Sequence, residues 1–206
     1  MLAYLPYFAH PEADDAFVVG LGMGITVNSL STINLNHVDV AEISPAVIQA
    51  SKKVFHDINQ NVLSNDNVNL IIEDGRGYLF STNKSYDIIT TNAVHPRISP
   101  NLYTKEFYKT CKNKLHENGV LCQWLPTNLM TEIEFQSLIK AFIEVFPNTS
   151  LWYLNHGHTL LLGQNGTLNL NINRLEQLFQ LPPVKRNARL AEVYNPGVFV
   201  SMYTVG

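Results

Sequence analysis

Three glycines stand close together near the start of the chain, in the stretch "FVVGLGMGITVNS". Gly20, Gly22 and Gly24 follow an apolar, β-branched run and precede a segment with helical character. Glycine lets a backbone turn tightly and approach a ligand closely, and the free N–H groups of a helix start attract anionic or nucleotide groups. The pattern alone leaves two interpretations open: a nucleotide-like ligand, or a tight strand-to-helix turn.

Two acidic residues stand at the ends of the next apolar runs. Glu42, at the end of "HVDVAEISP", is placed to accept hydrogen bonds from the two hydroxyls of a ribose, although a solvent-facing acid is the alternative. Asp74 and Gly75 lie in "IIEDGRGYL", where a carboxylate can accept from the exocyclic amine of adenine. Carboxyl ends of neighbouring parallel strands meet at one edge of a sheet, so these acids and the glycines predict one nucleoside-binding crevice.

The stretch "YDIITTNAVHP" ends a fourth apolar run in an amide and a histidine. Asn92 can form hydrogen bonds to adenine or to a substrate, but its amide group cannot take up a proton as a general base. His95 could remove a proton, because a neutral imidazole can act as a base near neutral pH. The alternative is a structural or solvated histidine before Pro96. We therefore treat Asn92 and His95 as the candidate catalytic residues.

Other polar and aromatic residues give weaker signals. Tyr103, Gln123 and Trp124 lie at the ends of core elements that face the predicted crevice, and either substrate contact or simple packing accounts for them. His156 and His158 could bind a metal, but two histidines at a hairpin tip without a third ligand are typical surface residues. We expect no metal.

The elements that must position these residues alternate along the chain. Continuously apolar runs are typical of parallel strands covered on both faces, and such strands need helical crossovers. "SLWYLNHGHTLLLG" indicates an antiparallel hairpin, and "LNINRLEQLFQ" and "VKRNARLAEVY" indicate short surface helices separated by Pro182 and Pro183. We predict strands at 16–20, 37–43, 68–72, 86–91 and 120–125, and helices at 25–31, 45–55, 75–81, 104–116 and 131–146.

Local signals support several of these boundaries. Ser44 precedes Pro45 at a first helical position, and Thr131 with Glu134 forms a capping box. The pair at 118–119, Asn-Gly, is expected to end one helix and to lead into the next strand. The sequence thus predicts an α/β fold of the doubly wound type, with a mostly parallel sheet of seven strands and an antiparallel hairpin near one edge.

Composition narrows the class of protein. The chain has 206 residues, is 46% hydrophobic and 15% charged, and carries a formal net charge of -3. One domain is expected, and no basic surface indicates a nucleic-acid partner. The sequence shows neither an apolar run long enough to span a bilayer nor a signal peptide, so a cytoplasmic location is expected. Both ends look cut, as in a fragment of a longer parent. Cys111 and Cys122 are expected to be buried thiols rather than a disulfide.

Several motifs resemble one family in order and spacing. The stretches "VVGLGMGITVNSL", "VDVAEISPAVIQASKKVF", "IIEDGRGYL", "YDIITTNAVHP" and "NLYTKEFYKTCKNKLHENGVLCQWLP" are similar to the spermidine synthases, which are polyamine aminopropyltransferases of the S-adenosylmethionine-dependent methyltransferase superfamily. The bacterial spermidine-synthase-like branch, often fused to membrane segments, is the more similar one. The resemblance covers roughly residues 2–163 and is most specific in the last stretch.

The resemblance implies a Rossmann-like methyltransferase fold and transfer of an aminopropyl group from decarboxylated S-adenosylmethionine to an amine. It assigns nucleoside binding to the glycine loop, Glu42, Asp74, Gly75 and Asn92. The family has aspartates at the positions of Met23, Asn92 and His95, so three of its acids are absent. We therefore expect altered or reduced aminopropyl transfer. The alternatives are a methyltransferase that uses intact S-adenosylmethionine on an unknown acceptor, and a non-catalytic nucleoside-binding module of a larger protein.

The resemblance also implies a domain organisation. Residues 1–166 are expected to form the nucleoside-binding catalytic domain and 167–206 a helical extension of it, with the small N-terminal β domain of the family absent. The expected partner is a small-molecule amine or another acceptor, with no nucleic acid and no membrane segment in this chain. The sequence leaves open whether a longer parent is membrane-associated. A homodimer is compatible with this interpretation, and the sequence leaves the oligomeric state open.

Overall fold

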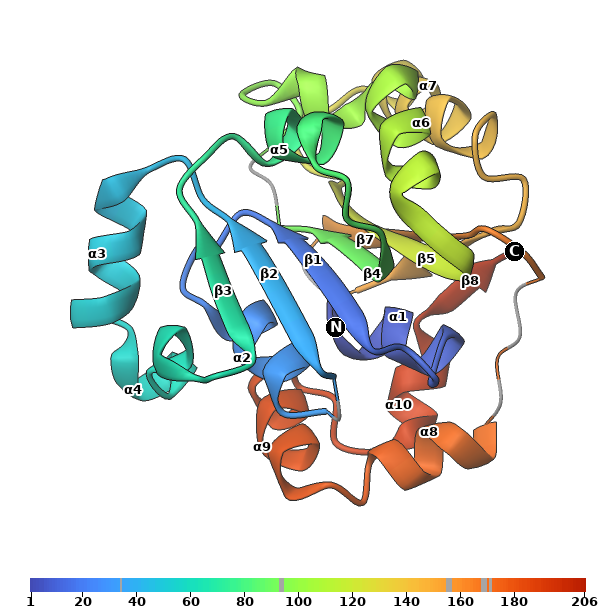
Figure 1. Cartoon of the computed structure of the whole chain (residues 1–206). Coiled ribbons are helices and arrows are strands. Elements are labelled where there is room, and N and C mark those ends of the chain that lie inside the picture. The colour runs from blue at the N-terminus through green and yellow to red at the C-terminus, as the bar shows by residue number, and fades with distance from the viewer. Residues whose placement is uncertain (34, 93–94, 155–156, 168–169, 171) are drawn as a thin grey trace.

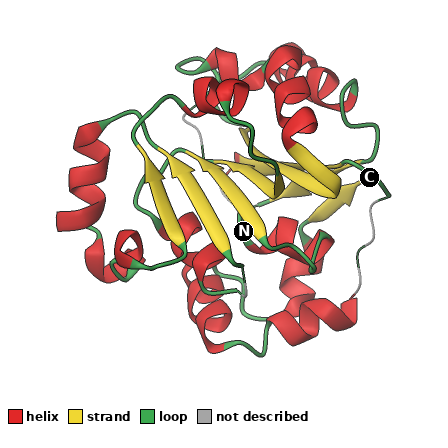
Figure 2. Cartoon of the chain, in the orientation of Figure 1, coloured by secondary structure: helices red, strands yellow, loops and turns green. Residues whose placement is uncertain are grey.

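The computed structural model shows one mixed β-sheet with helices on both faces (Figures 1 and 2). The structure describes residues 1–33, 35–92, 95–154, 157–167, 170 and 172–206. The strands in the described residues are β1 (Asp15–Val19), β2 (His37–Ala41), β3 (Val68–Ile71), β4 (Tyr86–Thr91), β5 (Leu115–Pro126), β6 (Thr149–Tyr153), β7 (His158–Gln164) and β8 (Tyr203–Val205).

The helices connect successive strands and also follow the last long strand. The α-helices in the described residues are α1 (Tyr4–Ala9), α2 (Ile25–Ser31), α3 (Pro45–Lys53), α4 (His56–Asn59), α5 (Gly75–Ser81), α6 (Lys105–Lys114), α7 (Glu132–Ile143), α8 (Ile172–Leu178), α9 (Pro182–Leu190) and α10 (Pro196–Ser201). Two short 3₁₀ turns cover Val62–Ser64 and Pro100–Tyr103.

The strand order across the sheet is β3-β2-β1-β4-β5-β7-β6-β8. Strands β1 to β5 pair in parallel, and β5, β7, β6 and β8 pair antiparallel. The order reverses beside β1, where β2 and β4 lie on its two sides. In an open α/β sheet, ligands bind where the strand order reverses, outside the carboxyl ends of the strands. The functional residues are therefore expected at the ends of β1, β2 and β4.

Two apolar layers hold the helices on the sheet. Helices α5, α6 and α7 cover one face and bury Leu79, Phe107 and Phe142 against it. Helices α1, α2, α8, α9 and α10 cover the other face, where the buried side chains include Leu175 and Phe199. The helices after residue 166 thus contribute to the same core as the first ones, although the domain division at that residue stays a prediction.

Helix starts follow the predicted signals. The Ser44 hydroxyl accepts a hydrogen bond from the Val47 N–H group at the start of α3. The capping box of α7 is complete, because Thr131 Oγ1 accepts from the Glu134 N–H and the Glu134 carboxylate accepts from the Thr131 N–H. Each cap satisfies N–H groups that have no partner within the helix.

Three expectations about the elements were wrong. The sheet of the described residues has eight strands instead of seven, because β8 pairs with the hairpin strand β6. Pro182 and Pro183 do not separate two helices; they form the first turn of α9, where proline's missing N–H costs nothing. Asn118 and Gly119 do not end α6, which stops at Lys114, but lie inside β5 at an irregularity in its pairing with β4.

Other features agree with the sequence or add to it. Helix α1 was not predicted, and β6 and β7 form the predicted hairpin, of which Asn155 and His156 lie outside the described residues. Cys111 and Cys122 are buried free thiols, as predicted. No helix in the part of the chain that the structure describes is both long and apolar enough to cross a membrane.

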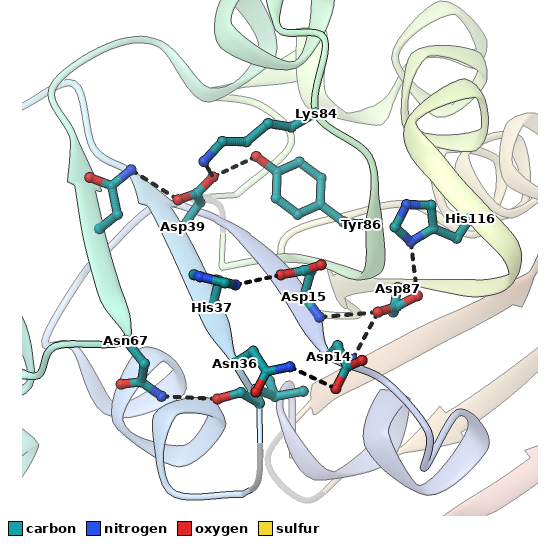
Figure 3. Close-up of polar contacts among 12 residues, drawn as sticks. Asp14, Asp15, Asn36, His37, Asp39, Asn67, Lys84, Tyr86, Asp87 and His116 are labelled. Atoms are coloured by element: carbon teal, nitrogen blue, oxygen red, sulfur yellow. Dashed lines mark hydrogen bonds and ion pairs between the residues drawn. The ribbon is translucent and has the colours of Figure 1, made fainter.

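The amino ends of the strands are tied together by Asp87, at the start of β4 (Figure 3). Its carboxylate accepts hydrogen bonds from the N–H groups of Asp14 and Asp15, at 2.8 and 3.0 Å, and lies 2.9 Å from His116 Nδ1. Burial alone would raise the pKa of Asp87, but these contacts together lower it below its usual value. This carboxylate joins β1, β4 and β5 at the edge opposite the expected ligand site.

Asp39, within β2, is a second buried acid (Figure 3). Its carboxylate accepts hydrogen bonds from the Tyr86 hydroxyl at 2.7 Å, Lys84 Nζ at 2.8 Å and Asn69 Nδ2 at 2.9 Å. Burial alone would raise the pKa of Asp39, but the three hydrogen bonds bring it below its usual value. The acid therefore links β2 to both β3 and β4.

Replacing Asp39 with alanine should lower the free energy of unfolding by about 2–4 kcal/mol, because the buried Tyr86 hydroxyl loses its acceptor. Lys84→Met is the control: this lysine is largely exposed and should cost about 1 kcal/mol or less. Urea unfolding measures both. Since the folded-state pKa of Asp39 is depressed, its ionised form stabilises above the unfolded pKa of about 3.9. The difference in free energy of unfolding between the wild type and Asp39→Ala should therefore narrow as the pH falls below that value. A difference that stays constant with pH would contradict a stabilising role for the ionised form of Asp39.

Candidate functional site

The glycine loop joins β1 to α2 and needs its three glycines. Gly20, Gly22 and Gly24 have φ angles of 89°, 55° and 86°, which side chains other than glycine rarely adopt. A Cβ atom on Gly20 would also lie 3.0 Å from the Asn92 carbonyl oxygen, and one on Gly22 would lie 3.1 Å from Asn92 Nδ2. The loop therefore runs directly against the residue that follows β4.

Glu42 follows β2 and is 8% exposed. One carboxylate oxygen, Oε2, accepts a hydrogen bond from the Leu21 N–H at 3.0 Å, and the other, Oε1, accepts from the Ser44 N–H at 2.8 Å. These backbone donors fix the carboxylate in place and connect it to the glycine loop. Each oxygen has a further lone pair, so the group can still accept hydrogen bonds from a ligand.

Asp74 and Gly75 follow β3 and begin α5. Asp74 is exposed, and its Oδ2 accepts from the Gly77 N–H at 2.8 Å, which caps the helix. Gly75 is buried, and a Cβ atom there would lie 2.9 Å from Val19 Cγ1. The structure thus gives Gly75 a packing role between α5 and β1, while its predicted contact with a nucleoside stays a prediction.

Asn92 lies where β4 ends, beside β1. Its N–H donates to the Val19 carbonyl at 2.9 Å, so the backbone continues the ladder by one residue. Its side-chain amide faces Gly22 of the loop. The amide therefore lies at the predicted edge of the sheet, between the ends of two neighbouring strands.

His95 lies in the loop after β4, and both of its ring nitrogens have partners. Nδ1 accepts from the Arg97 N–H at 3.2 Å, and Nε2 lies 3.2 Å from the Asn128 carbonyl oxygen. Since an N–H group can only donate, Nδ1 is unprotonated here and Nε2 carries the hydrogen. The ring joins the loop after β4 to the loop after β5, and neither nitrogen is free to accept a substrate proton in this arrangement.

Gln123 and Trp124 lie near the end of β5, and Gln123 is paired with Thr91 of β4. Gln123 is fully buried, and its Oε1 has no hydrogen-bond partner among the described residues. Burial raises the pKa of Tyr103, and a hydrogen bond from Gln123 opposes that shift. Trp124 points to the other face and packs against the His158 ring, with centroids 5.6 Å apart. Gln123 and Tyr103 therefore meet where β5 runs beside Thr91 of β4, and Trp124 does not join them because it lies on the other face of the sheet.

One contact to the glycine loop had no signal in the sequence. Asn59, the last residue of α4, is 2% exposed, and its Nδ2 donates to the Met23 carbonyl at 2.8 Å. Met23 itself has 46% of its surface exposed. The helix that carries Asn59 has four residues, too few for a hydrophobic period to show in the sequence.

The described residues hold no cluster suited to a metal ion. Among those residues, no group of three or more His, Cys, Asp or Glu side chains is arranged to hold an ion. His158 contacts Trp124, and its predicted neighbour His156 lies outside the described residues.

Comparison with known proteins gave consistent matches. The family model described as spermine/spermidine synthase domain matches residues 1–156. The polyamine aminopropyltransferase of Methanocaldococcus jannaschii is 34% identical over 126 residues, which cover 60% of this chain and 42% of that protein. The polyamine aminopropyltransferase of Buchnera aphidicola is 30% identical over 157 residues, or 75% of this chain and 55% of that protein. The chain thus spans about half the length of these curated relatives.

Solved structures show a similar fold. A spermidine synthase in complex with the transition state analogue AdoDATO superposes with a TM-score of 0.82 at 20% identity, covering 100% of this chain and 71% of that one. Human methyltransferase-like protein 13 in complex with SAH gives a TM-score of 0.64 at 19% identity, covering 91% of this chain and 87% of that one. The predicted Rossmann-like methyltransferase fold is confirmed.

Proposed function

Since this chain belongs to the spermine/spermidine synthase family, we propose that the carboxyl edge of its sheet binds decarboxylated S-adenosylmethionine or a nucleoside of that type. We further propose that the protein transfers the aminopropyl group to a small amine. The observation that carries this proposal is the Glu42 carboxylate, which is buried at the tip of β2 and bound to the glycine loop through Leu21. A fixed acceptor beside a glycine loop suits the paired hydroxyls of a ribose.

The neighbouring residues suit the other parts of a nucleoside. Asp74 uses Oδ2 to cap α5, which leaves Oδ1 to accept from an adenine amine. Ile43 and Ile72 follow the tips of β2 and β3 and are 67% and 66% exposed. Apolar side chains at these positions can pack against the faces of an adenine ring. Gly20 and Gly22 leave room for the ligand to approach the backbone.

The proposed reaction needs little covalent help from the protein. The amine nitrogen forms a bond to the carbon next to the sulfonium as the carbon–sulfur bond breaks, and the sulfur keeps the electron pair in methylthioadenosine. The attacking amine must first lose a proton to expose its lone pair. Asn92 cannot take this proton, and the ring nitrogens of His95 are already hydrogen-bonded. We therefore propose reduced or altered activity toward cationic diamines.

The acceptor side of the site is proposed around Gln123. Its side-chain oxygen Oε1 is buried and lacks a hydrogen-bond partner among the described residues. An N–H group of the substrate amine can donate a hydrogen bond to it. Tyr103 lies beside Gln123, is buried, and carries a hydroxyl that is uncharged at neutral pH. Because Gln123 and Tyr103 are both uncharged, they suit a substrate amine that binds in its neutral form better than a doubly charged diamine.

A second candidate, methyl transfer from intact S-adenosylmethionine, is favoured by one observation. Met23, half exposed on the glycine loop, is apolar, so the methionine carboxylate of the intact cofactor would meet no acid there. Calorimetric titration with S-adenosylmethionine, its decarboxylated form and methylthioadenosine distinguishes the two. Tighter binding of the decarboxylated form supports aminopropyl transfer, and tighter binding of the intact form supports methyl transfer. Binding of none of the three would overturn the nucleoside site itself.

A further inference from the structure

Asn59 makes a polar bridge between helix α3 and the glycine loop. Its side-chain Nδ2 donates to the Met23 carbonyl at 2.8 Å and to the carbonyl and hydroxyl oxygens of Ser51, both at 3.0 Å. The two hydrogens of the amide group are thus directed to the loop and to α3. The loop has no other side-chain donor to the Met23 carbonyl among the contacts of the described residues.

The bridge continues through the loop to Glu42. The Met23 carbonyl and the Gly24 N–H belong to the same peptide group, and that N–H donates to the Leu21 carbonyl at 2.9 Å. The Leu21 N–H in turn donates to the Glu42 carboxylate. One series of hydrogen bonds therefore runs from Asn59 across the loop to the acid that we assign to the ribose.

Asn59 lies between the glycine loop and a cavity. The cavity has a volume of about 310 Å³ and is lined also by Ser51, Lys52, Asn61, Leu63 and Ser64. On the other side, Asn59 lies so close to the loop that a Cβ atom on Gly24 would be 3.1 Å from both its Cβ and its Nδ2. The three loop glycines are conformationally permissive, so a fixed carbonyl at Met23 restricts a backbone that would otherwise sample more conformations.

We propose that Asn59 is a positioning residue for the nucleoside site: its amide fixes the Met23–Gly24 peptide and, through Leu21, the glycine loop against Glu42. The identity of the ligand as a nucleoside rests on the proposed function, whereas the hydrogen bond from Asn59 to the loop does not. Asn59 itself does not touch the nucleoside in this role. It lowers the cost of ordering the loop when a nucleoside binds.

The chain offers a matched control in Asn67. Its Nδ2 also joins two backbone carbonyls, those of Ser31 and Leu35, at 3.3 and 3.2 Å, but at the opposite edge of the sheet. Asn59→Ala and Asn67→Ala therefore remove similar bonds at the two ends of α2, of which only the first adjoins the glycine loop. Asn59→Asp is a second variant that keeps the shape of the side chain and removes the donor.

Calorimetry with decarboxylated S-adenosylmethionine and with methylthioadenosine, and amide hydrogen exchange of residues 20–24 in the free protein, test the proposal. In Asn59→Ala and Asn59→Asp, we expect about tenfold weaker binding and faster exchange in the loop, whereas Asn67→Ala should change both by less than about twofold. Unchanged loop exchange in the Asn59 variants, or equal effects in Asn67→Ala, would overturn it. If the wild type binds neither nucleoside, the proposed function fails, and loop exchange still decides the role of Asn59.

Discussion

Replacing Glu42 with alanine should weaken the binding of decarboxylated S-adenosylmethionine and of methylthioadenosine by about a hundredfold or more. A hydrogen bond to a charged group contributes about 1.5–3 kcal/mol, and the proposed contact to the ribose has two of them. The loss of about 3 kcal/mol corresponds to two orders of magnitude in the dissociation constant. The variant also removes the acceptor of the Leu21 and Ser44 N–H groups, so the glycine loop loses its hold on β2 as well. Titration calorimetry measures the effect directly.

Two further variants test whether the loss of affinity in Glu42→Ala comes from the charge and position of this carboxylate or from a general loss of structure. Glu73→Ala removes an exposed acid that follows β3 and should leave affinity within about threefold. Glu42→Gln keeps one acceptor oxygen and should bind about tenfold more weakly than the wild type, between the other two proteins. The melting temperatures of the variants, compared with that of the wild type, test whether unfolding causes any loss of affinity. Full affinity in Glu42→Ala would show that the ribose assignment is wrong.

The parallel part of the sheet could be predicted because its strands carry their signal in a few consecutive residues. Phe17, Val18 and Ile88 are fully buried, as expected for strands covered on both faces. By contrast, α1 has six residues, including Pro6, and β8 has three. Elements this short show no hydrophobic period, and contacts with the rest of the fold determine them.

The same distinction explains the candidate site. Glycine spacing and strand ends predicted that the loop, Glu42 and Asn92 would meet, because parallel strands end at one edge of a sheet. The partners of individual side chains were not predictable. His95 meets Asn128 and Asn59 meets Met23, and these contacts join loops separated by more than thirty residues in the chain. A polar side chain in a loop carries no sequence pattern that identifies so distant a partner.

Asn92→Asp should raise the rate of aminopropyl transfer to a diamine such as putrescine by about a hundredfold or more. A positioned general base commonly contributes 10²–10⁴-fold, and a carboxylate here would also attract the cationic acceptor. The site can accept the new side chain, because the amide it replaces has the same shape and lies beside Gly22, where there is no Cβ. Release of methylthioadenosine from decarboxylated S-adenosylmethionine, with the diamine as acceptor, measures the rate.

Asn101→Asp is the matched control, since it adds the same charge to the exposed turn that follows the same strand. It should leave the rate within about twofold, because water and salt screen an exposed charge. If Asn92→Asp binds the nucleoside normally and transfers no faster, proton removal at this position does not limit the reaction. The amide at the tip of β4 would then be compatible with full activity, and the acceptor would have to enter the site as a neutral amine.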